Sequence, residues 1–99
     1  MITPSQRLLK LHRALGLVSA QAGRPSPAPP AWGPVALDWA YGEQPTLVQA
    51  GVDMAIGRTA AASAAAIDAL ARSPSRPAAA VLADALSDSL ADIERRIGV

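Results

Sequence analysis

The stretch Thr46–Arg72 reads TLVQAGVDMAIGRTAAASAAAIDALAR and is the longest run of the chain without proline. Alanine, the residue with the highest intrinsic helix propensity, is the commonest residue in it. Thr46 and Gln49 have the spacing of a capping box at the start of a helix. At the other end, Pro74 disfavours helical geometry at the residue before it, Ser73. The sequence therefore predicts one long helix over residues 46–72.

This predicted helix has an apolar stripe bordered by very small residues. The stripe recurs every three or four positions, as expected of a helix face that packs on a core, and consists of Val48, Val52, Ile56, Thr59, Ser63, Ile67 and Leu70. Small flanking residues allow a second helix backbone to come close, and here they are Gly51, Ala55, Ala62 and Ala66. The alternative is that these residues only reflect an alanine-rich composition, and both interpretations stay open.

Two more amphipathic helices are predicted, one on each side of this stretch. Thr3 and Gln6 form a capping-box pattern with Pro4 at the first helical position, and Gly23 suits the position after a helix end. The first helix is therefore predicted over residues 4–22, with an apolar stripe of Leu8, Leu11, Leu15 and Val18. The second is predicted over residues 77–97, with a stripe of Leu82, Leu86, Leu90, Ile93 and Ile97.

The segment 24–34, RPSPAPPAWGP, contains five prolines and is predicted to be an extended crossing or a linker. A short helix over 35–41, opened by Pro34 and ended by Gly42, follows it. The predicted fold is all-α, with a helical hairpin (46–72, 77–97) and an N-terminal helix (4–22) in a single small domain, 1–99. The crossing exceeds the usual bundle loop of about 2–8 residues. Its length favours a displaced N-terminal helix, packed either on its own chain or on another subunit.

The composition limits both the core and the chemistry of the chain. It has 99 residues, many alanines, no phenylalanine and no cysteine. Burial yields about 25 cal/mol per Å² of apolar surface, so an alanine-rich core is thin, which favours self-association or a partner. Without cysteine there is no disulfide, zinc–thiolate site or thiol nucleophile. No apolar segment reaches the roughly 20 residues that cross a bilayer, so we expect a cytoplasmic protein without a membrane partner.

Charge is distributed unevenly, although the net charge is only +1. A basic row, Arg7, Lys10 and Arg13, lies on the first predicted helix, and an acidic row, Asp84, Asp88 and Asp92, lies on the last. Like charges four residues apart repel mildly, so we expect the two rows to meet, within or between chains. A metal on the acidic row would need further ligands that the sequence does not offer. Phosphate binding by the basic row would indicate a nucleic-acid protein.

All three aromatic residues, Trp32, Trp39 and Tyr41, lie within ten positions of each other. Tryptophan and tyrosine are enriched in interface hot spots, and proline-flanked segments dock readily on other proteins. The alternative is that the rings fill the thin core. We favour burial for Trp39, which shares a helix face with Val35, and leave Trp32 and Tyr41 open. The only histidine, His12, is expected at the boundary of the first helix's apolar stripe rather than in a catalytic role.

Together these patterns predict a non-enzymatic helical interaction or assembly module. It would be a small accessory or structural subunit of a larger complex, such as a virion, and its partner would be another protein or a second copy of itself. No catalytic residue, cofactor site or metal site is predicted. The predicted partner-binding residues are the basic row, the acidic row and the three aromatic residues. The alternative is a small nucleic-acid-associated regulator that binds phosphate through its basic N-terminal helix.

Overall fold

The computed structural model describes residues 2–99, which form four helices and contain no strand. They are α1 (Pro4–Gln21), α2 (Pro34–Glu43), α3 (Thr46–Arg72) and α4 (Arg76–Ile97). The all-α prediction is confirmed. The observed α3 has the predicted bounds, and α1 and α4 each differ from the prediction by one residue. The short helix continues to Glu43, so Gly42 lies inside α2 and does not end it.

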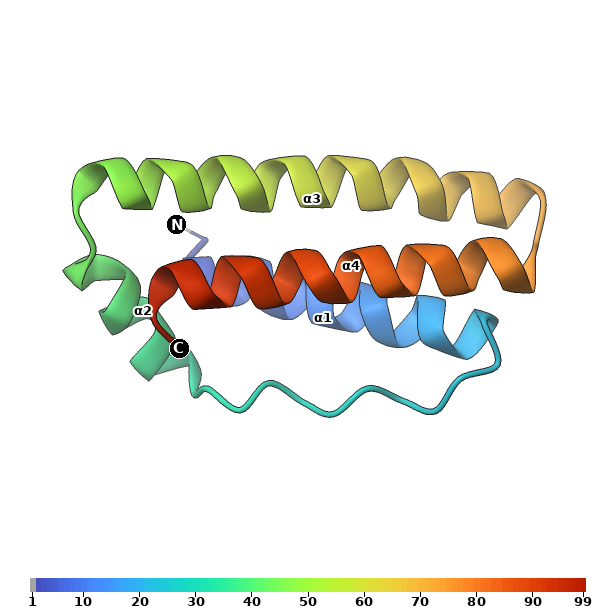
Figure 1. The fold of residues 1–99 in the computed structure, drawn as a ribbon, viewed down its shortest axis with the longest axis horizontal. Helices are drawn as coiled ribbons and strands as arrows, with labels where there is room; N and C mark the ends of the chain where they lie inside the picture. The colour runs from blue at the N-terminus through green and yellow to red at the C-terminus, as the bar shows by residue number, and fades with distance from the viewer. Residues whose placement is uncertain (1) are drawn as a thin grey trace.

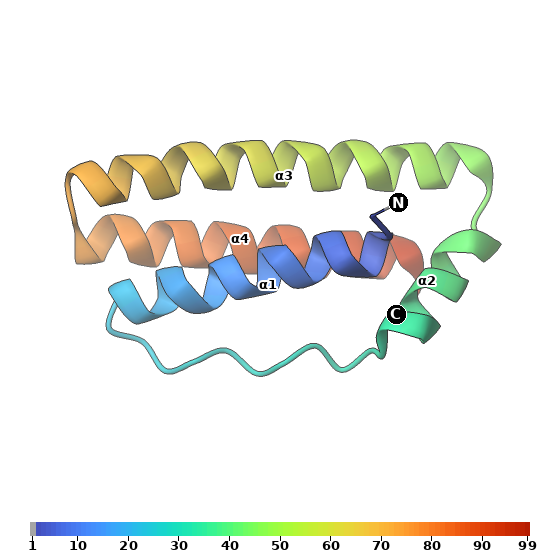
Figure 2. The ribbon, with the colours of Figure 1, turned by 180° about the vertical axis from the view of Figure 1, so that it is seen from behind.

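The three long helices lie side by side, and α2 crosses the end of the bundle where α3 begins (Figure 1). α4 packs against both α1 and α3, whereas α1 and α3 contact each other less. α1 and α3 run in the same direction and α4 runs in the opposite one (Figure 2). α1 therefore packs within its own chain, which answers the question that the sequence left open.

The core lies between the three long helices and follows the apolar stripes. The predicted α1 stripe is entirely buried, and so is the α4 stripe except for the partly buried Leu82. Two alanines of α4, Ala79 and Ala83, are buried beside these leucines. On α3 the buried residues are Val52, Ile56, Ser63 and Leu70. α3 and α4 therefore contact each other partly through small side chains.

One predicted capping box is present and the other is not. At the start of α1, the Thr3 hydroxyl accepts from the backbone N–H of Gln6, and the Gln6 side chain accepts from the backbone N–H of Thr3. At the start of α3 the prediction is wrong, because Pro45 is the cap residue and Thr46 already lies in the helix. The Gln49 amide instead donates to backbone carbonyls at the end of α2, those of Tyr41, Gly42 and Gln44.

The proline-rich segment runs back along the bundle as an extended strap (Figure 1). It must be long because α1 ends at one end of the bundle and α2 begins at the other. The turn into the strap uses Gly23, whose φ of 72° lies in the left-handed region that favours glycine. The length of the crossing therefore reflects a return path within one chain.

The small flank of α3 is only partly in contact with the rest of the chain. A Cβ atom added to Gly51 would meet no atom within 4 Å. Ala62 is exposed, and Ala55 and Ala66 are only partly buried. The close-packing interpretation is therefore wrong within the chain at Gly51 and Ala62, whereas the partly buried Ala55 does pack against the core.

Candidate functional site

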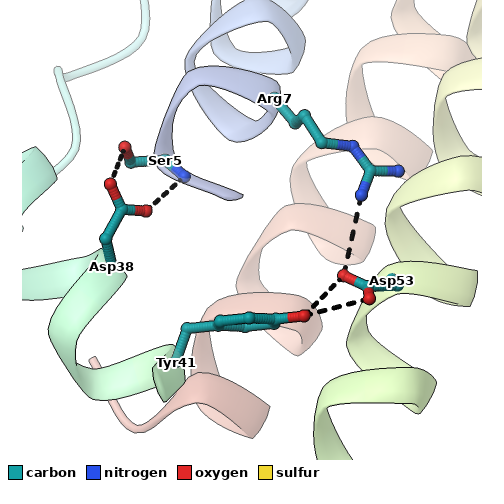
Figure 3. Close-up of polar contacts among 5 residues, drawn as sticks. All are labelled: Ser5, Arg7, Asp38, Tyr41 and Asp53. Atoms are coloured by element: carbon teal, nitrogen blue, oxygen red, sulfur yellow. Dashed lines mark hydrogen bonds and ion pairs between the residues drawn. The ribbon is translucent and has the colours of Figure 1, made fainter. Parts of the chain in front are cut away.

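The end of the bundle closed by α2 gathers polar contacts from three helices (Figure 3). Leu37 anchors α2 by burying its side chain completely in the core. Next to it, the carboxylate of Asp38 accepts from the backbone N–H of Ser5 at 2.8 Å and from the Ser5 hydroxyl at 2.7 Å. Ser5 lies in the first turn of α1, where the free N–H groups and the helix dipole stabilise a negative charge. Asp38 therefore ties α2 to the start of α1.

A second polar contact ties α2 to α3. The Tyr41 hydroxyl donates to the carboxylate of Asp53, whose two oxygens each lie 2.9 Å away, and Arg7 Nη1 lies 3.6 Å from Asp53 Oδ1. Burial of the phenol, and then its hydrogen bond and electrostatic repulsion with Asp53, raise the pKa of Tyr41 above its ordinary value. Tyr41 thus has a structural role within the chain, and so does Arg7 of the basic row.

The opposite face of α2 presents apolar side chains to solvent. Val35 is 85% exposed and Trp39 is 70% exposed. The predicted burial of Trp39 is wrong, because Leu37 and Tyr41 occupy the face of α2 that turns inward. Both pairs have i,i+4 spacing, so periodicity alone did not distinguish the inner face from the outer one. We call Val35 and Trp39 the outward face of α2.

Trp32 lies on the strap and packs against the edge of the core. Its ring meets that of His12 edge-on, with centroids 6.0 Å apart, and its buried Nε1 has no hydrogen-bond partner among residues 2–99. His12 is partly buried, and its Nε2 lies 2.7 Å from Oε1 of Glu94 on α4. The boundary position expected for His12 is observed, and the histidine links α1, α4 and the strap.

The basic and acidic rows do not meet within residues 2–99. Arg7 pairs with Asp53, and no ion pair in this part of the chain involves Lys10, Arg13 or Asp88. Asp92 is instead paired along its own helix, with Arg96 at 3.1 Å and Arg95 at 3.5 Å. The expectation that the rows pair is therefore wrong within one chain, and pairing between chains stays a prediction.

Asp84, the remaining member of the acidic row, pairs with the strap. Its Oδ1 accepts from Arg24 Nη1 at 2.6 Å. This hydrogen bond and the accompanying charge attraction lower the pKa of the Asp84 carboxyl and raise the pKa of Arg24. Both side chains are well exposed, so salt will screen this contact.

Other chemistry was sought in the described part of the chain. No group of three or more His, Cys, Asp or Glu side chains in residues 2–99 lies close enough together to hold a metal ion. None of the helices described is both long and apolar enough for a membrane span. An open groove of about 370 Å³ runs between α3 and α4, and Met54, Arg58 and Asp92 are among its lining residues.

Sequence reasoning missed four residues that hold this end of the bundle together: Ser5, Asp38, Asp53 and Glu94. Each is a single polar residue whose partner lies on another helix, so no local pattern identifies it. Comparisons of the chain with family models, with curated proteins and with solved structures found no match. The functional argument therefore rests on the geometry of the chain itself.

Proposed function

We propose that this chain is a non-enzymatic helical interaction module, an accessory or structural subunit that binds a protein partner through the outward face of α2. The observation that carries the proposal is the 70% exposure of Trp39 on a helix held firmly from its other side. Tryptophan is among the residues most enriched in interface hot spots. In the complex, burial of Trp39 and Val35 would remove a large apolar area from water.

The way α2 is held supports this proposal. Leu37 anchors the helix in the core, Asp38 binds the start of α1, and Tyr41 binds Asp53 on α3. The Gln49 side-chain amide donates hydrogen bonds to the backbone carbonyls at the end of α2. A partner would thus meet a side chain whose backbone is already ordered, and less conformational entropy would be lost on binding. This arrangement favours recognition of a defined protein surface. The proposal places the resulting assembly in the cytoplasm.

The alternative, phosphate binding by the basic row, has less support from the geometry. Arg7 lies 3.6 Å from a carboxylate oxygen of Asp53, which partly neutralises it and leaves Lys10 and Arg13. Nucleic-acid modules generally carry denser basic patches. A salt-dependent mobility shift with random DNA would favour the alternative, and we expect none at physiological salt.

The proposal is tested by expressing the tagged 99-residue chain in cells of its source organism. We expect a partner to co-purify in a fixed ratio, and Val35→Ser or Trp39→Ser to release it. The matched control is Val81→Ser on α4, because Val81 is also an exposed valine on a helix, at 70% exposure. Circular dichroism would verify that every variant remains helical. The proposal would be contradicted if the partner stayed bound to the Trp39→Ser variant. It would also be contradicted if no partner co-purified with the wild-type chain in a fixed ratio.

A further inference from the structure

The side of α3 that faces away from the core has a second periodic stripe. Its positions alternate in steps of three and four, the repeat of a coiled-coil seam, and every one is exposed. We call it the outer stripe, and its members are Leu47, Ala50, Met54, Gly57, Ala61, Ala64, Asp68 and Ala71. Two of these are large apolar residues, Leu47 at 87% exposure and Met54 at 57%.

No helix among residues 2–99 covers this stripe. α4 and α1 lie on the core side of α3, and both ribbon views show α3 along the edge of the bundle with no segment beyond it (Figures 1 and 2). Over residues 59–67 the helix carries no charge on any face. The outward face of a helix on a soluble bundle is normally charged or polar, so this one has the character of a contact surface.

We propose that the outer stripe binds the outer stripe of a second copy of this chain, with the two α3 helices antiparallel. We place Gly57 opposite Asp68 of the second copy, a register in which residues 54–71 of the two helices overlap and Leu47 lies outside the overlap. Ala61 then lies opposite Ala64, which allows the backbones to approach closely. Met54 lies opposite Ala71, so a large side chain meets a small one.

The charges support a second copy as the occupant and antiparallel as the orientation. Arg58 follows Gly57, so in this register its guanidinium lies next to Asp68 of the second copy, and the twofold axis creates the same contact twice. Neither Arg58 nor Asp68 has an ion-pair partner within residues 2–99. A parallel pair in register would instead bring the two Asp68 carboxylates together, which is unfavourable. This inference concerns a different surface from the outward face of α2, so either proposal can fail alone.

The first experiment measures the mass of the purified 99-residue chain by sedimentation velocity over a range of concentrations. We expect a dimer for the wild type and a monomer for Ala61→Arg, because a bulky charge in the central layer prevents close approach. The control Ala85→Arg introduces the same side chain at an exposed alanine of α4 and should leave the dimer intact. Circular dichroism would verify that both variants are folded. A monomeric wild type, or a dimer that survives Ala61→Arg, would overturn the inference.

The second experiment tests register and orientation. Arg58→Asp or Asp68→Arg alone should weaken the dimer about tenfold, since each dimer contains two copies of the pair and each contributes a few-fold. The double variant should restore the affinity. The chain has no cysteine, so chains with Met54→Cys and chains with Ala71→Cys can be mixed and oxidised. We expect the disulfide between the two kinds of chain. The antiparallel pairing would be refuted if the double variant did not recover the dimer affinity. It would also be refuted if disulfides formed only between two Met54→Cys chains or between two Ala71→Cys chains.

Discussion

His12 Nε2 on α1 lies 2.7 Å from Glu94 Oε1 on α4, and both side chains are partly buried. These two residues are 82 positions apart in the sequence, and their contact joins the first long helix to the last. The ring of Trp32 on the strap lies edge-on to the same histidine. The pair therefore connects the strap to the two helices beneath it.

We predict that Glu94→Ala lowers the free energy of unfolding by about 1–3 kcal/mol, because it leaves a partly buried His12 without its hydrogen-bond partner. Urea denaturation followed by circular dichroism measures the loss. Asp88→Ala is the matched control, since Asp88 is an exposed acid on the same helix with no ion pair in residues 2–99. Equal midpoints for the two variants would show that the contact contributes nothing.

Alkaline pH should destabilise the chain through Tyr41. The folded chain raises the pKa of this phenol above its ordinary value of 10.0, so the folded state holds the proton more tightly than the unfolded state does. The stabilisation is therefore complete below about pH 10 and lost as the pH rises through the folded-state pKa. Tyr41→Phe should be about 0.5–1.5 kcal/mol less stable at neutral pH, and its stability should fall less in the alkaline range.

Direct titration separates the causes of this shift. Tyr41 is the only tyrosine, so the ultraviolet absorbance of tyrosinate reports it alone. We expect Asp53→Asn to bring the pKa part of the way back toward its ordinary value, because burial, the largest cause, persists. An unshifted phenol in the wild type would contradict the contact with Asp53.

We predict opposite effects of alanine at two glycines. Gly51→Ala should stabilise the chain by about 1 kcal/mol, because the new Cβ meets no atom within 4 Å and alanine is the better helix former. Gly23→Ala should destabilise it by about 1–2 kcal/mol, since the φ there is 72° and the new Cβ would lie 3.1 Å from Arg76 Cζ. Thermal unfolding of both variants provides the comparison, and a loss of stability in Gly51→Ala would show that another helix does approach there.

The fold was largely predictable because its signals are local. Periodic apolar residues, glycine at a helix end and the prolines at positions 4, 34 and 74 each act within a few residues. They were enough to place the long helices to within one residue. The exception is Gln49, which looked like half of a capping box but binds the end of α2. A glutamine has the same local pattern in both roles, and only the position of α2 distinguishes them.

The candidate site was less predictable because its contacts join distant helices. Asp38 and Ser5 lie 33 positions apart, and nothing near either residue indicates the other. The sequence correctly placed Trp39 and Val35 on one face of a helix. It did not predict that this face points to solvent instead of the core. In a ten-residue helix the direction depends on which side meets the rest of the bundle, and the buried Leu37 is what fixes it.

The return path of the strap has a consequence for the order of folding. The turn between α3 and α4 spans only residues 73–75, so this hairpin closes a short loop at little entropic cost. α1 can join α4 only through contacts between remote parts of the chain, such as the one spanning 82 positions from His12 to Glu94. Long-range contacts form slowly. The α3–α4 hairpin should therefore assemble first, and the docking of α1 onto it should set the folding rate.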